Sequence, residues 1–211
     1  MVISEVNNMF ERARNIFKNI KKSIESEEYK ENISEFQKAL EKLVCEYDTA
    51  DWENRFIVGD ALEVLFCALL NSMGFKCKWL KEKRYDIEVN GVKFSMKSSF
   101  TGSGDIRLIN ILGNETVTWE EPTLFFISGV GICYADPEMD IETRHKRDAL
   151  VVSVSGIKEV IEQSNNEWLI SIDIPRKPQN PTKIKTASYG VAKSILDEIN
   201  SKYLRNHLPV I

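Results

Sequence analysis

The segment that most restricts the fold of this 211-residue chain is an apolar run inside a predicted helix. The helix extends from about Asp51, which can cap its first turn, to Met73, and Gly74 can end it in the left-handed conformation. Its apolar side chains lie nearly all round the helix: Ala61, Leu62, Val64, Leu65, Phe66, Ala68, Leu69 and Leu70. A helix of that kind is buried, so other elements must cover it on every side.

One acid, Glu63, lies inside this apolar run. A buried carboxylate is costly unless something compensates its charge. Two interpretations are open at this point. In the structural one, a cation such as Arg55 or Lys97 pairs with Glu63. In the functional one, Glu63 faces a cleft and contacts a metal ion or a water molecule bound to it.

A strand and then a β-hairpin are predicted after the helix. Residues 75–79 (FKCKW) alternate apolar and basic side chains, as a half-buried strand does. Residues 84–99 contain Asn90-Gly91, a two-residue sequence typical of a type I′ turn between antiparallel strands.

The turn also predicts which hairpin residues share a face. If Val89 pairs with Val92, the period of two places these polar side chains on one face: Asp86, Glu88, Lys93, Ser95 and Lys97. The other face then carries the apolar side chains Ile87, Val89, Phe94 and Met96. Asp86 and Lys97 therefore converge diagonally across the strands.

The rest of the chain predicts two N-terminal helices and several further strands. Residues 6–24 and 28–47 repeat apolar side chains every three or four positions, as amphipathic helices that pack on a core or on a second subunit do. The later elements are expected as a buried strand with a glycine-marked bend at 124–135, a polar loop at 136–148, a strand at 150–154, a helix at 156–163, a strand at 168–174 and a closing helix at 188–204.

This order of elements predicts an α/β fold with a mixed central β-sheet flanked by helices. We expect a single domain over residues 1–211, with an N-terminal helical layer at 1–48 and the core segment that carries the site at 51–110.

Positive charge is concentrated in one part of the chain. The whole sequence has a net charge of −4, but eight basic and four acidic residues between 76 and 107 give that window +4 and leave −8 for the remainder. A basic strip on an acidic body suits a protein that meets DNA through one face, although the same lysines can simply keep a strand edge solvated.

Two segments supply candidate contacts to DNA. One follows the glycine-serine loop at 98–104, and the other is the polar segment at 136–148, expected either as a phosphate-contacting loop or as a plain solvated one. The candidate DNA-binding residues are Arg107, Asn110, Arg144, Lys146 and Arg147.

Cysteine and histidine usage argues against several kinds of site. The cysteines are scattered without a CxxC pair, at Cys45, Cys67, Cys77 and Cys133, so neither a disulfide framework nor a zinc site is expected. Only two histidines are present, His145 and His207, which argues against a histidine-rich metal site.

Because no apolar run is long enough to span a bilayer and the N-terminus lacks a signal-peptide pattern, we expect a cytoplasmic protein.

Glu63, Asp86 and Lys97 together suit hydrolysis of a phosphodiester bond. That reaction needs a divalent cation, a deprotonated water molecule and a positive group that holds the phosphate. Carboxylates with open coordination positions suit Mg²⁺. Asp86 would be the principal ligand and Glu63 the second, directly or through water. Lys97 would orient or deprotonate the attacking water and stabilise the pentavalent phosphate.

The pattern Gly59-xxx-Glu63, then Asp86, then Ser95-Met96-Lys97 resembles the PD-(D/E)xK nuclease superfamily over about forty residues. The resemblance implies a restriction-endonuclease-like core, Mg²⁺-dependent cleavage, Asp86 as a metal ligand and Lys97 as the catalytic lysine. The candidate catalytic residues are Glu63, Asp86, Ser95 and Lys97, of which Asp86 and Glu63 are also the candidate metal ligands.

Two positions differ from the superfamily pattern. Tyr85 replaces a frequent proline. Ser95 replaces the usual acid, and since serine is a poor Mg²⁺ ligand, Glu63, Glu88 or Asp105 would have to supply the missing charge.

The size of the chain and the absence of helicase or ATP-binding motifs make it resemble a small type II restriction endonuclease within that superfamily. The resemblance implies a homodimer that cuts double-stranded DNA at a short specific sequence, with a cognate DNA methyltransferase as its genetic partner. The alternatives are a structure-directed repair or junction nuclease, a catalytically inactive DNA-binding relative, and a scaffold protein in which Asp86 and Lys97 form a surface ion pair.

Overall fold

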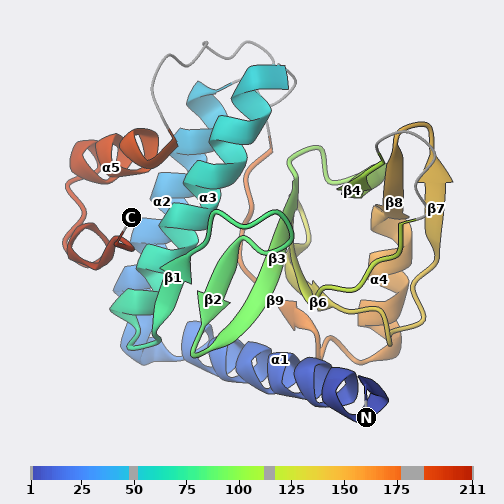
Figure 1. The fold of residues 1–211 in the computed structure, drawn as a ribbon. Helices are drawn as coiled ribbons and strands as arrows, with labels where there is room; N and C mark the ends of the chain where they lie inside the picture. Colours follow the sequence, from blue (N-terminus) through green and yellow to red (C-terminus); the bar gives the residue numbers. More distant parts are fainter. Residues whose placement is uncertain (1, 48–51, 112–116, 177–187, 211) are drawn as a thin grey trace.

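The structure is a computed structural model that defines residues 2–47, 52–111, 117–176 and 188–210, with side chains from residue 9 in the first range and residue 56 in the second. Figure 1 shows the helices α1 (Val2–Ile24), α2 (Lys30–Glu46), α3 (Trp52–Ser72), α4 (Val154–Gln163) and α5 (Ser188–Glu198). The strands are β1 (Cys77–Trp79), β2 (Ile87–Val89), β3 (Val92–Ser99), β4 (Asp105–Asn110), β5 (Thr123–Ile127), β6 (Gly131–Ala135), β7 (Thr143–Lys146), β8 (Ala149–Ser153) and β9 (Leu169–Ile170). Two 3₁₀ turns are η1 (Glu27–Tyr29) and η2 (Arg205–His207).

The strands of these residues form two sheets. The larger has the order β1-β2-β3-β5-β6-β9, and β4-β8-β7 form a separate antiparallel sheet. Strands β3 and β5 run parallel whereas the other neighbours in the larger sheet are antiparallel. The predicted α/β fold with a mixed central sheet is therefore confirmed, but the second sheet was not expected.

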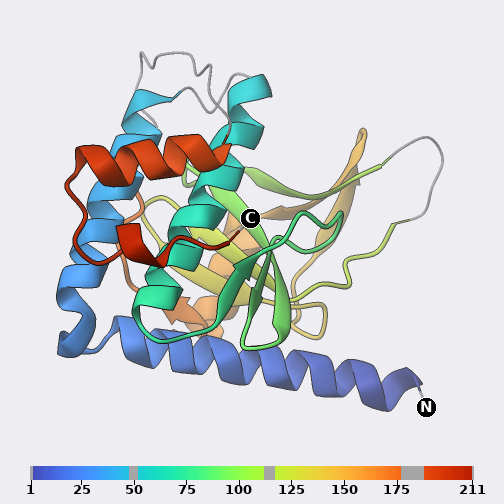
Figure 2. The ribbon, with the colours of Figure 1, turned by 60° about the vertical axis from the view of Figure 1, so that its left-hand side comes forward.

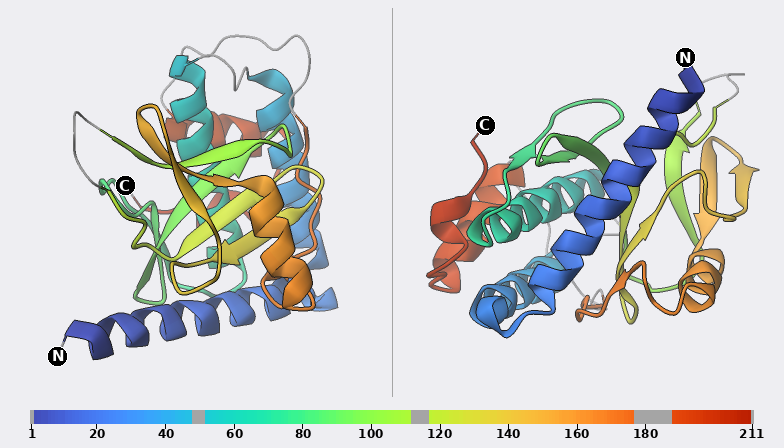
Figure 3. Two further views of the ribbon diagram at one scale, coloured as in Figure 1. Left: turned by 90° about the vertical axis from the view of Figure 1, so that its right-hand side faces the viewer. Right: turned by 90° about the horizontal axis from the view of Figure 1, so that it is seen from below.

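Helices cover the larger sheet from two sides. Figures 1 and 2 show α2, α3 and α5 packed together on one side of the larger sheet, with α1 passing beneath the strands. Figure 3 shows α4 on the other side, beside the second sheet. Strand β5 contributes side chains to a separate core on each face of the sheet. Leu124 and Phe126 belong to the core formed with α1, α2, α3 and α5. Phe125 and Ile127 join a second core with α4. The N-terminal helices thus belong to the main core.

The central hairpin has the predicted register. Val89 pairs with Val92. The intervening Asn90 and Gly91 have φ angles of 49° and 81°, as a type I′ turn requires. Helix α3 also ends as predicted, because Gly74 has a φ of 87°. The proposed cap at Asp51 lies outside the described residues.

The prediction of one bent strand at 124–135 is wrong, because this segment forms the antiparallel pair β5 and β6. The chain reverses at residues 128–130, where Gly129 has a φ of 72°. Gly131 has a φ of 132°, and a Cβ there would lie 2.3 Å from the carbonyl oxygen of Ile170. Both glycines thus permit a reversal and a close strand contact that a larger residue would oppose.

The prediction of a loop throughout 136–148 is also wrong. Strand β7 occupies its end and pairs with β8 through a two-residue turn at Arg147 and Asp148. Arg147 has a φ of 55°. A run of charges is typical of a loop, but alternation in a strand places Arg144 and Lys146 on one face of the second sheet.

Two later elements are shorter than predicted. Only two residues of the expected strand at 168–174 pair with the sheet as β9, and the closing helix ends at Glu198 instead of residue 204. The left-handed residue Asn200, with a φ of 52°, ends that helical path. The carboxylate of Glu35 on α2 then accepts hydrogen bonds from the amides of three residues, Lys202, Tyr203 and Leu204.

Helix α1 is fastened to the sheet by a buried ion pair. The guanidinium of Arg14 donates two hydrogen bonds, of 2.8 and 2.7 Å, to the carboxylate of Asp136. Asp136 is fully buried, and it also accepts a hydrogen bond from the hydroxyl of Tyr134. Its negative charge has lost its water, so Arg14 is needed to compensate it.

We expect Arg14→Ala to lower the free energy of unfolding by about 3 kcal/mol, because it leaves the Asp136 carboxylate buried without its cation. Urea denaturation followed by circular dichroism measures this change. Arg12→Ala, which removes an exposed arginine from the same helix, is the matched control. Equal losses in the two variants would contradict the role of the ion pair.

Candidate active site

Asp86 immediately precedes β2 and is held firmly by its neighbours. Its amide donates to the carbonyl oxygen of Phe94 at 2.9 Å. Its carboxylate oxygen Oδ2 accepts hydrogen bonds from the hydroxyl of Ser95, at 3.1 Å, and from the amide of Met96. Three contacts to the neighbouring strand therefore set both the position and the orientation of this carboxylate.

Lys97 lies beside Asp86, as the hairpin register predicts. Its Nζ is 3.6 Å from Oδ2 of Asp86, and the two side chains are 25% and 22% exposed. Lys97 is on β3, opposite Phe125 of the parallel strand β5, so its backbone is fixed in the middle of the sheet. This partial exposure leaves both charged groups accessible to a ligand.

Glu63 reaches the same place from α3. Its carboxylate oxygen Oε2 accepts a 2.9 Å hydrogen bond from Nε1 of Trp79. Among the described residues, the neutral donor Trp79 therefore binds this carboxylate, whereas Lys97 forms no hydrogen bond with it. The expected partner Arg55 has its side chain outside the described residues. Lys97 acts on Glu63 only through its charge, which favours the ionised form.

Burial raises the pKa of Glu63 from 4.5 to about 8, and the negative charge of Asp86 contributes to the same effect. The hydrogen bond from Trp79 and the charge of Lys97 act in the opposite direction. Ionisation of Glu63 beside Asp86 is therefore unfavourable, and a cation bound between the two carboxylates would favour it.

A further acid, Asp60, was missed by the sequence analysis. It lies one helical turn before Glu63 on α3, and burial raises its pKa. Its Oδ2 accepts a hydrogen bond of 3.0 Å from the hydroxyl of Ser188 at the start of α5. The spacing of three residues from Glu63 was the available signal, because such pairs share one helix face.

Ser95, the fourth candidate catalytic residue, contacts the carboxylate of Asp86. It is 5% exposed and donates its hydroxyl hydrogen to Asp86, while its amide donates to the carbonyl oxygen of Pro122 at 2.9 Å. Glu88 is bound to Lys78, with 2.8 Å between the charged atoms. Glu63, another of the acids expected to supply the missing charge, has its pKa raised in part by the charge of Asp86.

An open cleft of about 550 Å³ lies between these residues and the second sheet. One wall comes from the beginning of α3 and the end of β3, and the other comes from β4. Its charged and amide-bearing lining residues are Asp60, Glu63, Asp86, Lys97, Asp105, Arg107 and Asn110. Acids and one lysine on one wall thus face a partly basic wall.

The candidate DNA-binding residues all lie on the second sheet or its turn. Arg107 pairs with Asp148 at 2.9 Å and also contacts the side-chain oxygen of Asn110 at 3.4 Å. Arg144 and Lys146 both bind Asp105, each at 2.8 Å.

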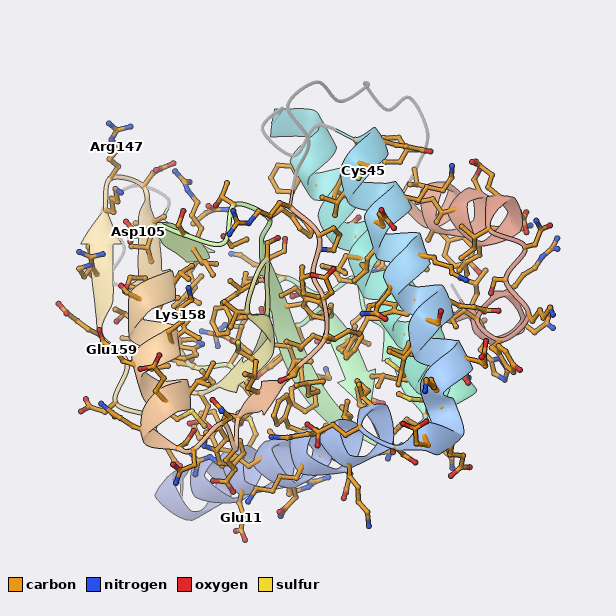
Figure 4. All side chains as sticks on the ribbon, turned by 180° about the vertical axis from the view of Figure 1, so that it is seen from behind. Glu11, Cys45, Asp105, Arg147, Lys158 and Glu159 are labelled. Carbon is orange, nitrogen blue, oxygen red and sulfur yellow. The ribbon has the colours of Figure 1, made fainter. Side chains whose placement is uncertain are left out.

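Arg147 lies at the exposed tip of the sheet and points away from the body in Figure 4. Only Arg107 and Asn110 of the five candidates line the cleft itself. The structure therefore separates them into two residues in the cleft and three farther along the same sheet.

The donor set fits a hydrated Mg²⁺ better than a metal enclosed by protein. Among the described residues, no group of three or more histidine, cysteine or acidic side chains is arranged to hold a metal ion. Mg²⁺ commonly uses only one or two carboxylates and keeps its remaining positions for water and phosphate. Asp86 and Glu63, with Asp60 nearby in the cleft, suit that second arrangement.

Comparison of the chain with protein-family models, with curated proteins and with solved structures finds no match. In the described parts of the chain, no helix combines the length and apolar character needed to cross a membrane.

Glu63→Gln should make the protein more stable at alkaline pH. A pKa raised in the folded state means that wild-type stability falls as the pH rises from about 4.5 to about 8, because the folded protein holds a proton that the unfolded chain has lost. Glutamine carries no such proton and keeps an oxygen for Trp79. Urea denaturation at pH 5 and pH 9 should show a gain at pH 9 of a few kcal/mol at most, at about 1.4 kcal/mol per pKa unit.

The control is Glu11→Gln, which changes an exposed glutamate on α1. It should leave the pH dependence of stability unchanged. If Glu63→Gln also follows the wild-type curve, Glu63 is not a titrating group in this pH range.

Proposed function

We propose that this protein is a Mg²⁺-dependent endonuclease that cleaves phosphodiester bonds in double-stranded DNA, and that it acts as a type II restriction endonuclease at a short specific sequence. The observation that carries the proposal is the pairing of Asp86 and Lys97 at 3.6 Å on one hairpin, beside the half-buried acid Glu63 and within an open cleft. This is the combination that phosphodiester hydrolysis needs.

Asp86 and Glu63 are the residues that would hold the metal ion. Mg²⁺ bound there supplies positive charge for the scissile phosphate and for the water that attacks it. The protein prepares the site by fixing Asp86 through Ser95 and Met96 and by holding the carboxylate of Glu63 with a hydrogen bond from Trp79. Ser95 is thus a residue that positions Asp86.

Lys97 supplies the fixed positive charge of the protein itself. Its ammonium group, kept next to Asp86 on a central strand, can contact a non-bridging phosphate oxygen and orient the attacking water. On the opposite wall, Arg107 and Asn110 can contact the DNA backbone or base edges. The DNA would then lie along the second sheet, where Arg144, Lys146 and Arg147 are exposed.

A second candidate function, an inactive DNA-binding relative, is favoured by one observation. Ser95 is buried and replaces the acid that active members of the resembled superfamily usually carry. Against this candidate, α3 places Asp60 and Glu63 in the same cleft as Asp86. A protein that only binds DNA gains nothing from the repulsion between such acids.

A function as a restriction endonuclease implies two partners, a second copy of the chain and a DNA methyltransferase. A homodimer would bring two clefts to the two strands of a short palindrome, and a DNA methyltransferase of the same specificity would protect the host DNA. Helix α1 lies along the outside of the fold (Figure 3) and would then contribute to the dimer contact.

The first experiment incubates the purified protein with unmethylated phage DNA in Mg²⁺ or in EDTA and separates the products on a gel. Discrete fragments that need Mg²⁺ are expected. A smear, or cleavage confined to branched DNA, would favour a structure-directed repair or junction nuclease instead. Retarded but uncut DNA would favour the inactive relative, and neither cleavage nor retardation would contradict both functions.

Asp86→Ala and Lys97→Ala should each reduce cleavage by roughly a hundredfold or more, since each removes a charge that acts on the reacting phosphate. The thermal unfolding temperature should change little, because both side chains are partly exposed. Lys93→Ala is the matched control: it lies on the same strand and pairs with Glu82, outside the cleft. Cleavage at the wild-type rate by either site variant would refute the assignment.

The double variant Arg144→Ala/Lys146→Ala should bind DNA more weakly and with less dependence on salt. Each lost phosphate contact lowers the slope of log K against log salt by about one. Fluorescence anisotropy with labelled DNA in Ca²⁺ measures this slope. A double variant of the exposed α2 residues Lys30 and Lys38 should match the wild type; equal slopes for all three proteins would remove the second sheet from the DNA-binding surface.

A further inference from the structure

The indole of Trp79 connects strand β1 to the acidic side of the cleft. Its Nε1 donates a hydrogen bond of 2.9 Å to Oε2 of Glu63, sixteen positions earlier in the chain. Trp79 lies at the end of β1, where it pairs with Ile87 of β2, the residue that follows Asp86. Trp79 therefore contacts Glu63 directly and is joined to the strand that begins beside Asp86.

The ring of Trp79 is itself held on more than one side. It stacks on Tyr189 with a centroid separation of 6.4 Å and an interplanar angle of 28°. The ammonium group of Lys81 lies 4.9 Å from the ring centre. With the ring packed in this way, the indole N–H has a fixed direction, so the carboxylate that accepts its hydrogen is fixed as well.

Helix α5 supports both acids that α3 contributes to the cleft. Ser188, its first residue, donates to Asp60 at 3.0 Å, and the next residue, Tyr189, packs on the indole that binds Glu63. Figure 2 shows α5 lying across α3. Two adjacent residues far along the chain thus order two carboxylates one helical turn apart.

We propose that Trp79 is a positioning residue for Glu63, holding one carboxylate oxygen so that the other is presented to a divalent cation shared with Asp86. This inference rests on the proposed metal-dependent function. A carboxylate on a flexible side chain would lose rotational freedom on binding a cation, and the indole removes that freedom in advance. Hydrogen-bond partners of metal ligands act in this way in metal sites generally.

The test compares Trp79→Phe, which keeps an aromatic ring but lacks the N–H donor, with the wild type. The probe is Mn²⁺ alone, whose free concentration is counted by electron paramagnetic resonance in the absence of DNA. The dissociation constant for Mn²⁺ should rise about tenfold or more, as changes next to metal ligands commonly cause. Asp86→Ala should abolish this binding.

Trp168→Phe is the matched control. Trp168 is also a half-buried indole, with Tyr134 at a centroid distance of 5.6 Å and the Lys18 ammonium 5.0 Å from its ring centre. It lies next to β9, away from the cleft, so its replacement should leave the Mn²⁺ affinity unchanged.

A second measurement uses the fluorescence emission of Trp79 itself as the signal. Tryptophan emission should change when Mg²⁺ is added to the wild type and to Trp168→Phe, since the indole is bonded to a ligand of the metal. Emission of Trp79→Phe and of Glu63→Gln should not respond. An unaltered response in Glu63→Gln would overturn the inference even if Trp79→Phe failed to fold.

The outcomes separate this inference from the function on which it rests. If the wild type binds Mn²⁺ and cuts DNA while Trp79→Phe binds Mn²⁺ equally well, the role of Trp79 is wrong and the nuclease assignment stands. If the wild type binds no Mn²⁺ and cuts no DNA, both are wrong.

Discussion

The register of the hairpin formed by β2 and β3 is the constraint on which the rest of the structure depends. Strand β3 pairs with β2 on one side and with β5 on the other, so its alternating side chains decide what both faces of the sheet carry. Phe94 and Met96 enter the main core, whereas Lys97 points to the opposite face beside Asp86. A shift of one residue would exchange the two sets and would place the lysine in the core.

The acidic residues of the resulting site lower the stability of the fold. Helix α3 is apolar on nearly every side, yet it carries Asp60 and Glu63 toward the cleft, where burial raises the pKa of each carboxylate. Neutral donors, Trp79 and Ser188, satisfy these acids without neutralising them. The buried acid Asp136 differs from them, because the cation Arg14 is paired with it. The buried acid of the core is thus paired with a cation, whereas the two acids of the cleft are held by neutral donors.

The second sheet converts this acidic wall into a cleft with two chemically different sides. The loop between β3 and β4 turns the chain away from the larger sheet, and β4 returns as the facing wall with Arg107 and Asn110. The basic residues of this sheet are held by Asp105 and Asp148 at its surface. These exposed ion pairs contribute little to the stability of the fold.

Local sequence determined the elements around the site. The apolar run of α3, the turn residues Asn90-Gly91 and the period of two in the hairpin depend only on neighbours along the chain, so they predicted that Asp86 and Lys97 converge. Local pattern did not reveal that 124–135 folds back on itself or that β7 joins a second sheet, because pairing of strands is decided by packing between distant segments.

The partners of the acids are also a property of the tertiary structure alone. Trp79 and Ser188 lie sixteen and 128 positions from the carboxylates they bind, and no periodicity connects such residues. By itself, the sequence determined which charged groups lie on the hairpin and that α3 must be buried with an acid inside it. Only the folded chain decided which donors hold that acid and which wall faces it, since both follow from the packing of α5 and β4 around the hairpin.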